Sequence, residues 1–145
     1  MIPIAGNKSA YYERALLDFG LSAIAFTPPA TLYLALSTSS FSTTATGSLM
    51  NEVSFTGSAY SRVAIVANLT NFPAASGSNP ATKSNGTVFT FPTAVASWGT
   101  ILSAYLVDAS TGGSILYGAD LTASKTIQTG DTATYAVGAL TITEL

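Results

Sequence analysis

From residue 30 onward, apolar and polar residues of this chain mostly alternate with a period of two, whereas the first 20 residues contain a helical repeat. In the helical part, Tyr12 and Leu16 lie four residues apart, which places them on one face of an α-helix. Asn7 or Ser9 is suited to cap the start of this helix, and Gly20 is suited to end it. The pattern therefore predicts one short N-terminal helix followed by a region of β-strands.

Short runs rich in β-branched and aromatic residues make up the β-region, and turn residues separate them. They predict seven to nine strands, which lie at residues 31–37, 59–68, 87–91, 101–108, 114–121, 125–128, 134–137 and 140–143. Residues 110–113 (STGG) predict a hairpin turn, because the two glycines can take positive φ. Since no helical crossover separates the strands, the predicted fold class is mainly β: an antiparallel β-sandwich, jelly-roll-like, with one short N-terminal helix.

The predicted elements divide the chain into an N-terminal arm with its helix, residues 1–29, and a single β-sandwich domain, residues 30–145. A chain of this length is one domain by default. Two predicted loops are long: residues 37–47 are mostly Ser and Thr, and residues 72–86 are rich in Gly, Pro, Ser and Asn. Such loops are either surface arms or partly disordered segments.

Charge is scarce along the whole chain, with 5 Lys or Arg and 7 Asp or Glu among 145 residues. Five basic residues and a net charge of −2 do not suit binding to a phosphate backbone, so we expect no nucleic-acid partner. No run of 18 apolar residues exists, so we expect no membrane-spanning helix. The low charge fits two interpretations: a neutral exterior of Ser, Thr, Asn and Gly, or an exterior covered by other subunits.

Candidate chemistry is equally sparse. The chain has no His and no Cys, which excludes catalytic triads, zinc fingers and disulfides. Of the seven carboxylates, Asp108 and Asp120 are the only tempting pair, on either side of the predicted hairpin turn. The expected register places Asp108 opposite Ile115 and Asp120 opposite Ser103, which separates the two acids. We therefore predict no catalytic, metal or cofactor site, and no enzyme activity.

Aromatic side chains are the other candidate resource, because tyrosines and a tryptophan can form a sugar-binding platform. The candidates are Tyr33, Tyr60, Trp98, Tyr105, Tyr117 and Tyr135. Phe89, Phe91 and Trp98 lie close together in the sequence, and core packing is the preferred interpretation for most of these aromatic residues.

Four segments of the chain contain distinctive motifs. Residues 15–39 contain ALLDFGL and FTPPATLYLALSTS, residues 57–66 read GSAYSRVAIV after Glu52, and residues 90–117 read TFPTAVASWGTILSAYLVDASTGGSILY. Residues 118–143 add the Gly-Asp-Thr and Gly-Ala-Leu-Thr-Ile-Thr pieces. Together these motifs resemble a family of small tailed-bacteriophage virion proteins, and the resemblance covers nearly the whole chain. It implies a structural protein of a phage particle, made in the host cytoplasm, without catalytic residues.

The resemblance leaves two functions open. The preferred hypothesis is a cement, or decoration, protein on the capsid exterior that braces neighbouring major capsid proteins. The alternative is a tail or fibre component that binds a receptor or glycan, in which case loops 37–47 and 72–86 should be exposed and carry aromatic residues. A small glycan-acting enzyme is disfavoured, because the carboxylates are too few and too far apart.

The expected partners are the major capsid protein and further copies of this chain, as a homodimer or homotrimer. The N-terminal arm could lie across a neighbouring subunit, and the exposed strand edges could pair between copies. The predicted interface residues are Ile2, Ile4, Tyr11, Tyr12 and Arg14.

Overall fold

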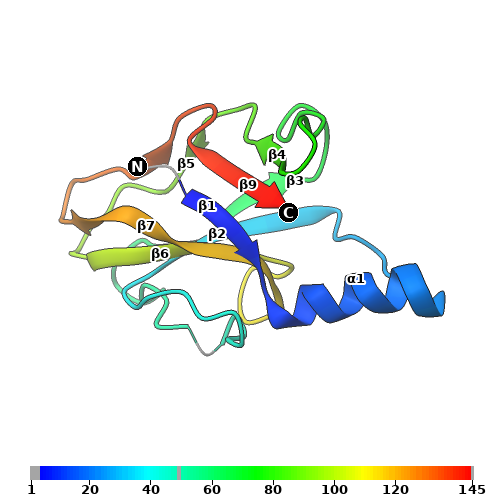
Figure 1. Ribbon diagram of the computed structural model, residues 1–145. Helices are drawn as coiled ribbons and strands as arrows, with labels where there is room; N and C mark the ends of the chain where they lie inside the picture. Colours follow the sequence, from blue (N-terminus) through cyan, green and yellow to red (C-terminus); the bar gives the residue numbers. More distant parts are fainter. Residues whose placement is uncertain (1–3, 49, 145) are drawn as a thin grey trace.

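Nine strands and one helix make up the described part of the protein, residues 4–48 and 50–144 of a computed structural model (Figure 1). The elements are β1 (Ile4–Lys8), α1 (Ala10–Ser22), β2 (Thr31–Ser37), β3 (Val63–Val66), β4 (Ala81–Ser84), β5 (Phe89–Thr90), β6 (Gly99–Val107), β7 (Ile115–Ile127), β8 (Thr134–Tyr135) and β9 (Leu140–Glu144). The predicted fold class is confirmed as mainly β with antiparallel sheets, consistent with a β-sandwich that carries a short N-terminal helix.

The strands form one large sheet and one small ribbon. The large sheet has seven strands in the order β3-β2-β6-β7-β1-β9-β4, and the ribbon pairs β5 with β8. Neighbouring strands are antiparallel except β1 and β9, which are parallel. In the β6–β7 hairpin Ser103 lies opposite Asp120, as the sequence predicts, while Ile115 pairs with Val107 because of a register shift.

Alternation along the strands sends apolar side chains to both faces of the large sheet. On one face Leu34 and Leu36 enter the main core, which the β5–β8 ribbon and its connecting loops cover. Tyr60, Phe91 and Trp98 lie at the centre of this core, and their ring centroids are 5.2–6.2 Å apart. Trp98, Phe89 and Phe91 are all buried, so the predicted core role is confirmed and no sugar platform forms from them.

The Ser/Thr-rich loop that follows β2 covers the opposite face of the sheet. Phe41 and Ala45 pack against a second buried cluster, made of Ala35, Met50, Tyr105, Val107 and Ile115. Polar contacts hold the loop in place: the Ser103 hydroxyl donates to the Ser39 carbonyl at 2.7 Å, and the Phe41 N–H donates to Asp120 at 2.6 Å. The loop is therefore a packed layer of the fold.

Gly47 carries the closest backbone approach in this layer, and it yields a testable prediction. A Cβ on Gly47 would lie 2.0 Å from the Gly112 carbonyl oxygen, so Gly47→Ala forces the loop away from the β6–β7 turn. We expect the variant to lose about 1–3 kcal/mol of unfolding free energy, measured by urea denaturation. Gly20→Ala is the matched control: it adds a methyl group to open space in α1 and should gain up to about 1 kcal/mol. Equal stability of the two variants would contradict this packing.

Two strands of the large sheet were not predicted from the sequence pattern. Residues 4–8 of the predicted arm form β1, which lies between β7 and β9. The predicted 72–86 loop contains β4, which pairs with β9 at one edge of the sheet. Both segments, IAGNK and ATKS, lack an apolar alternation, and their pairing comes from partners distant in the sequence.

Candidate interaction surface

The start of α1 is fixed to the sheet by its N-cap. The Ser9 hydroxyl accepts a hydrogen bond from the Tyr12 N–H at 3.1 Å and donates to the Ile115 carbonyl. The Ser9 N–H donates to the Leu116 carbonyl, and the Ala10 N–H donates to the Thr43 carbonyl, both at 2.8 Å. Ser9 is buried, so this end of the helix is a rigid part of the fold. The prediction of Ser9 as one of two candidate caps is confirmed.

The rest of α1 leads away from the sheet (Figure 1). None of its residues, all of which the structure describes, is buried. The helix continues through Gly20, so the predicted end at that glycine is wrong. It ends instead at Ala23, which takes a left-handed conformation with φ of 52°, and the Ile24 N–H donates to the Asp18 carbonyl at 3.2 Å. This carbonyl contact closes the last turn of the helix without a glycine.

Large apolar side chains gather on this projecting segment. Of the eleven large hydrophobic residues exposed in the described chain, five lie between positions 11 and 24. Four of them form what we call the helix surface: Leu17 (59% exposed), Phe19 (57%), Leu21 (84%) and Ile24 (57%). Leu17 and Phe19 point to different sides of α1, and a helix that is apolar on several sides is normally buried. The helix surface is therefore suited to contact with another molecule.

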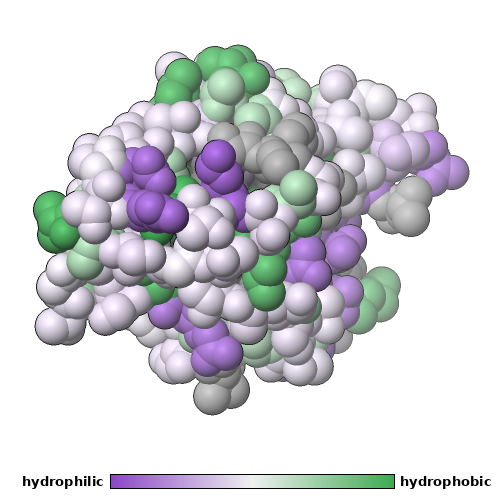
Figure 2. Space-filling view, turned by 90° about the vertical axis from the view of Figure 1, so that its left-hand side faces the viewer, coloured by the Kyte–Doolittle hydropathy of each residue, from purple (hydrophilic) through white to green (hydrophobic). Residues whose placement is uncertain are grey.

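By contrast, the side of the molecule opposite α1 is mostly neutral in hydropathy. Figure 2 shows strongly hydrophilic side chains there only as scattered groups, among many residues of intermediate hydropathy. This face is thus a mostly neutral exterior, whereas the helix surface exposes large apolar side chains.

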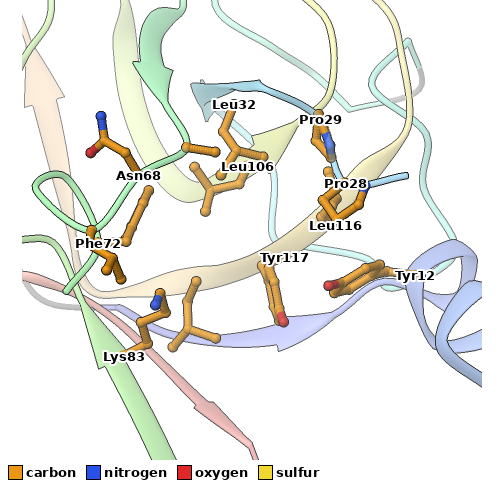
Figure 3. A pocket seen from close by; sticks show the side chains of 13 residues that line it. Tyr12, Pro28, Pro29, Leu32, Asn68, Phe72, Lys83, Leu106, Leu116 and Tyr117 are labelled. Carbon is orange, nitrogen blue, oxygen red and sulfur yellow. The ribbon is translucent and has the colours of Figure 1, made fainter. Parts of the chain in front are cut away.

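An apolar groove lies beside the base of α1 (Figure 3). Its volume is about 380 Å³. The residues that line it are Tyr12, Pro28, Pro29, Leu32, Ala67, Asn68, Leu69, Phe72, Lys83, Leu106, Leu116, Tyr117 and Ile142. Tyr12 packs edge-on against Tyr117, with ring centroids 5.1 Å apart, and also contacts Phe26 at 5.5 Å. Burial, followed by the neighbouring Tyr12 and Glu144, raises the pKa of Tyr117.

Asp18 on α1 and Lys83 beside the groove have no ion-pair partner among the described residues. Among residues 4–48 and 50–144, ion pairs form between Lys8 and Glu144 and between Arg62 and Glu52. Arg14 and Asp18 lie four residues apart on α1, a spacing that suits an ion pair, yet the two side chains do not pair. Lys83 reaches toward the groove from β4, and its Nζ donates to the Pro73 carbonyl at 2.9 Å (Figure 3).

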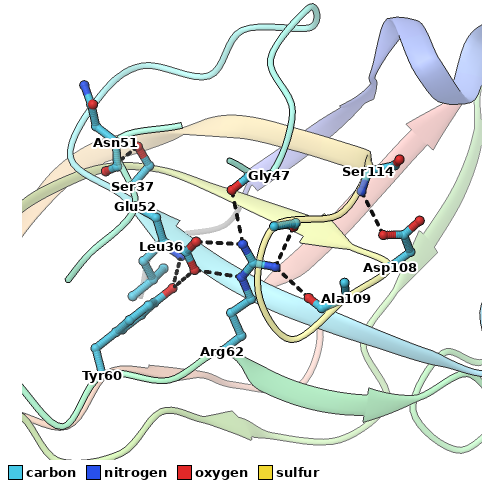
Figure 4. Close-up of polar contacts among 11 residues, drawn as sticks. Leu36, Ser37, Gly47, Asn51, Glu52, Tyr60, Arg62, Asp108, Ala109 and Ser114 are labelled. Atoms are coloured by element: carbon cyan, nitrogen blue, oxygen red, sulfur yellow. Dashed lines mark hydrogen bonds and ion pairs between the residues drawn. The ribbon is translucent and has the colours of Figure 1, made fainter. Parts of the chain in front are cut away.

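A buried polar cluster lies elsewhere, where β3 approaches the β6–β7 turn (Figure 4). Arg62 makes a two-pronged contact with Glu52, through Nε to Oε1 at 2.8 Å and Nη2 to Oε2 at 2.7 Å. Its Nη1 donates to the Ala109 and Gly112 carbonyls at 2.6 and 2.9 Å. The Tyr60 hydroxyl donates to Glu52 at 2.9 Å. These contacts connect three segments of the chain.

Burial and the contacts with Glu52 shift the pKa values of Arg62 and Tyr60 in this cluster. Burial alone would lower the pKa of Arg62, but its hydrogen bonds to Glu52 and the charge of that carboxylate raise it. Burial and the Glu52 charge raise the pKa of Tyr60, so its hydroxyl stays protonated. Two hydrogen bonds pair Arg62 with Glu52, so the cluster ties together three segments of the fold.

The predicted interface residues fall in three different environments. Ile2 lies outside the described residues, and Ile4 pairs with Leu140 in β1 within the sheet. Tyr11 and Arg14 are exposed on α1, and Tyr12 lines the groove. The pattern did not single out the helix surface. The signal was present in residues 15–26, ALLDFGLSAIAF, where large apolar side chains are too frequent for one helix face.

The carboxylates that the sequence suggested for chemistry have structural partners. Asp108 accepts a hydrogen bond from the Ser114 N–H at 2.8 Å, and Asp120 accepts one from the Phe41 N–H. In the part of the chain that the structure describes, no group of three or more acidic, His or Cys residues could hold a metal ion. No described helix has the length and apolar character needed to cross a membrane.

Comparison with protein families identifies the group to which these features belong. The family model of the podophage GP4 fiber I protein gp80 matches residues 7–143. The chain belongs to this family. No curated protein matches the sequence. The family establishes a structural protein of a bacteriophage, in agreement with the resemblance noted in the sequence, and the match spans α1, the large sheet and the groove alike.

Proposed function

We propose that this protein is a non-enzymatic structural subunit of a bacteriophage tail fibre, and that it assembles through the helix surface. The observation that carries the proposal is α1 itself. Its N-terminus is fixed to the sheet, while its apolar residues extend into solvent, where exposure of such side chains is costly unless a partner covers them.

The family supports the fibre more than the capsid. The description of the matching family names a fibre protein and does not mention a capsid protein. The scarcity of charge and the apolar helix would suit a cement protein on the capsid exterior as well, because both roles bury surface against other subunits. The family description therefore favours the fibre over the capsid.

A receptor-binding or glycan-binding role has less support from the loops. The aromatic residues of the two long loops are Phe41 and Phe72, and both turn inward: Phe41 packs on the sheet, and Phe72 is buried in the main core. A sugar platform needs exposed aromatic faces, which these two rings do not provide. We therefore propose assembly, rather than host recognition, as the role of this subunit.

Electron microscopy of virions labelled with a gold-conjugated antibody against this protein tests the location. We expect gold particles at the tail fibres, with no label over the capsid. Virions of an unrelated phage, treated with the same antibody, provide the control for non-specific labelling. Label distributed over the capsid surface would overturn the fibre role in favour of a capsid cement protein.

A further inference from the structure

We propose that the helix surface of one copy docks in the groove of a second copy, so that two chains form a dimer with two-fold symmetry. This inference rests on the proposed structural role, because it names the partner of the surface through which that role is exerted. The two contacting surfaces belong to the same chain, and each copy uses both.

The two surfaces match in chemistry and size. The groove is lined almost entirely by apolar side chains, and Leu69 at its margin is 71% exposed. Its volume of about 380 Å³ accommodates side chains of the size of Leu17 and Leu21, which lie one turn apart on the same side of α1. Covering the helix surface and the groove together removes two apolar areas from water, which favours association.

The positions of the two surfaces fit a two-fold axis. The groove lies at the N-terminal end of α1, where Tyr12 lines it, whereas Leu21 and Ile24 lie at the far end, which leads away from the body (Figures 1 and 3). A helix of 13 residues is about 20 Å long. When two such helices lie antiparallel, the far end of each meets the groove of the other, and both contacts form at once.

Charge favours a second copy over other occupants. Asp18 lies between Leu17 and Phe19 in the sequence, and among the described residues no basic side chain pairs with it. Lys83 lines the groove and contacts a carbonyl rather than a carboxylate. Docking brings an unpaired anion on the helix surface to an unpaired cation in the groove. We infer an ion pair between Asp18 of one copy and Lys83 of the other.

Sedimentation equilibrium of the full chain, combined with charge reversal, tests the dimer. We expect a mass twice the 14.8 kDa of one chain. Asp18→Lys and Lys83→Asp should each raise the dimer Kd about tenfold or more, because each places like charges together. The double variant Asp18→Lys/Lys83→Asp restores opposite charges and should regain most of the lost affinity. Lys125→Asp, on the exposed part of β7, is the matched control and should leave the Kd unchanged.

Three results would overturn the dimer: a monomer at every accessible concentration, a dimer insensitive to both single reversals, or no recovery in the double variant. If a small ligand or a different virion protein occupies the groove instead, the chain should stay monomeric. The antibody labelling of virions tests the fibre role independently of the dimer. A monomer located on fibres rejects the dimer alone, and a dimer located on capsids rejects the fibre role alone.

Discussion

Replacing Arg62 by Met should lower the free energy of unfolding by about 3–5 kcal/mol. The Arg62 side chain is 1% exposed and that of Glu52 is 8% exposed, so the substitution leaves a buried carboxylate without its cation. It also leaves the Ala109 and Gly112 carbonyls without the Arg62 donor. Urea denaturation followed by fluorescence of Trp98, the single buried tryptophan, measures the loss.

The charge pair can be separated from simple packing by a mutant cycle. The double variant Arg62→Met/Glu52→Gln removes both charges, and we expect it to recover about 2 kcal/mol relative to Arg62→Met alone. Lys125→Met removes a cation from an exposed position on β7 and should change stability by less than about 0.5 kcal/mol. If Arg62→Met were as stable as Lys125→Met, the buried cluster would not hold the loops as described.

Stability should also fall steeply above pH 10. Burial raises the pKa of Tyr60, Tyr105, Tyr117 and Tyr135 in the folded protein above the usual value of 10.0. Below pH 10 these tyrosines are protonated in both states, so their contribution to stability is fully present. Above pH 10 the unfolded chain loses the protons that the folded chain keeps. Each such tyrosine then costs about 1.4 kcal/mol of stability for each further pH unit.

Urea unfolding at pH 8, 10 and 11, combined with tyrosinate absorbance, measures this dependence. Tyr135→Phe provides a matched variant, because the Tyr135 hydroxyl is buried and has no hydrogen-bond partner among the described residues. The variant should lose about 1 kcal/mol less than the wild type between pH 10 and pH 11, because the unfolded tyrosine is already half ionised at pH 10. Full ionisation of the tyrosines near pH 10 without unfolding would show that these side chains are not buried.

Local patterns predicted much of this fold, because alternation and turn chemistry are local signals. The β6–β7 hairpin follows from the glycines at 112 and 113, and its register places Asp120 opposite Ser103 as expected. Strands β1 and β4 were not predicted, because their residues alternate weakly and pair only with strands that lie far away in the sequence. A pattern read over a short stretch of sequence therefore cannot predict such pairing.

The candidate site was predicted only in part, for a similar reason. Tyr11, Tyr12 and Arg14 were placed on a helix that could contact a neighbour, and the structure puts them on α1. The groove, however, is built from α1, β2, β4, β6, β7, β9 and the loops beside them, so no local motif marks it. The role of Arg62 was also hidden, because its carbonyl partners lie 47 and 50 residues away.

Assembly of this protein into the virion, we propose, depends on the helix surface. Virions assembled with Leu17→Gln/Leu21→Gln as the sole copy of the protein test it directly, once Trp98 fluorescence has shown that the variant folds. The matched control is Val88→Gln/Val95→Gln, which changes two apolar residues that are comparably exposed away from α1. We predict that purified virions lack the helix variant and contain the control at the wild-type level. Wild-type incorporation of Leu17→Gln/Leu21→Gln would contradict the claim.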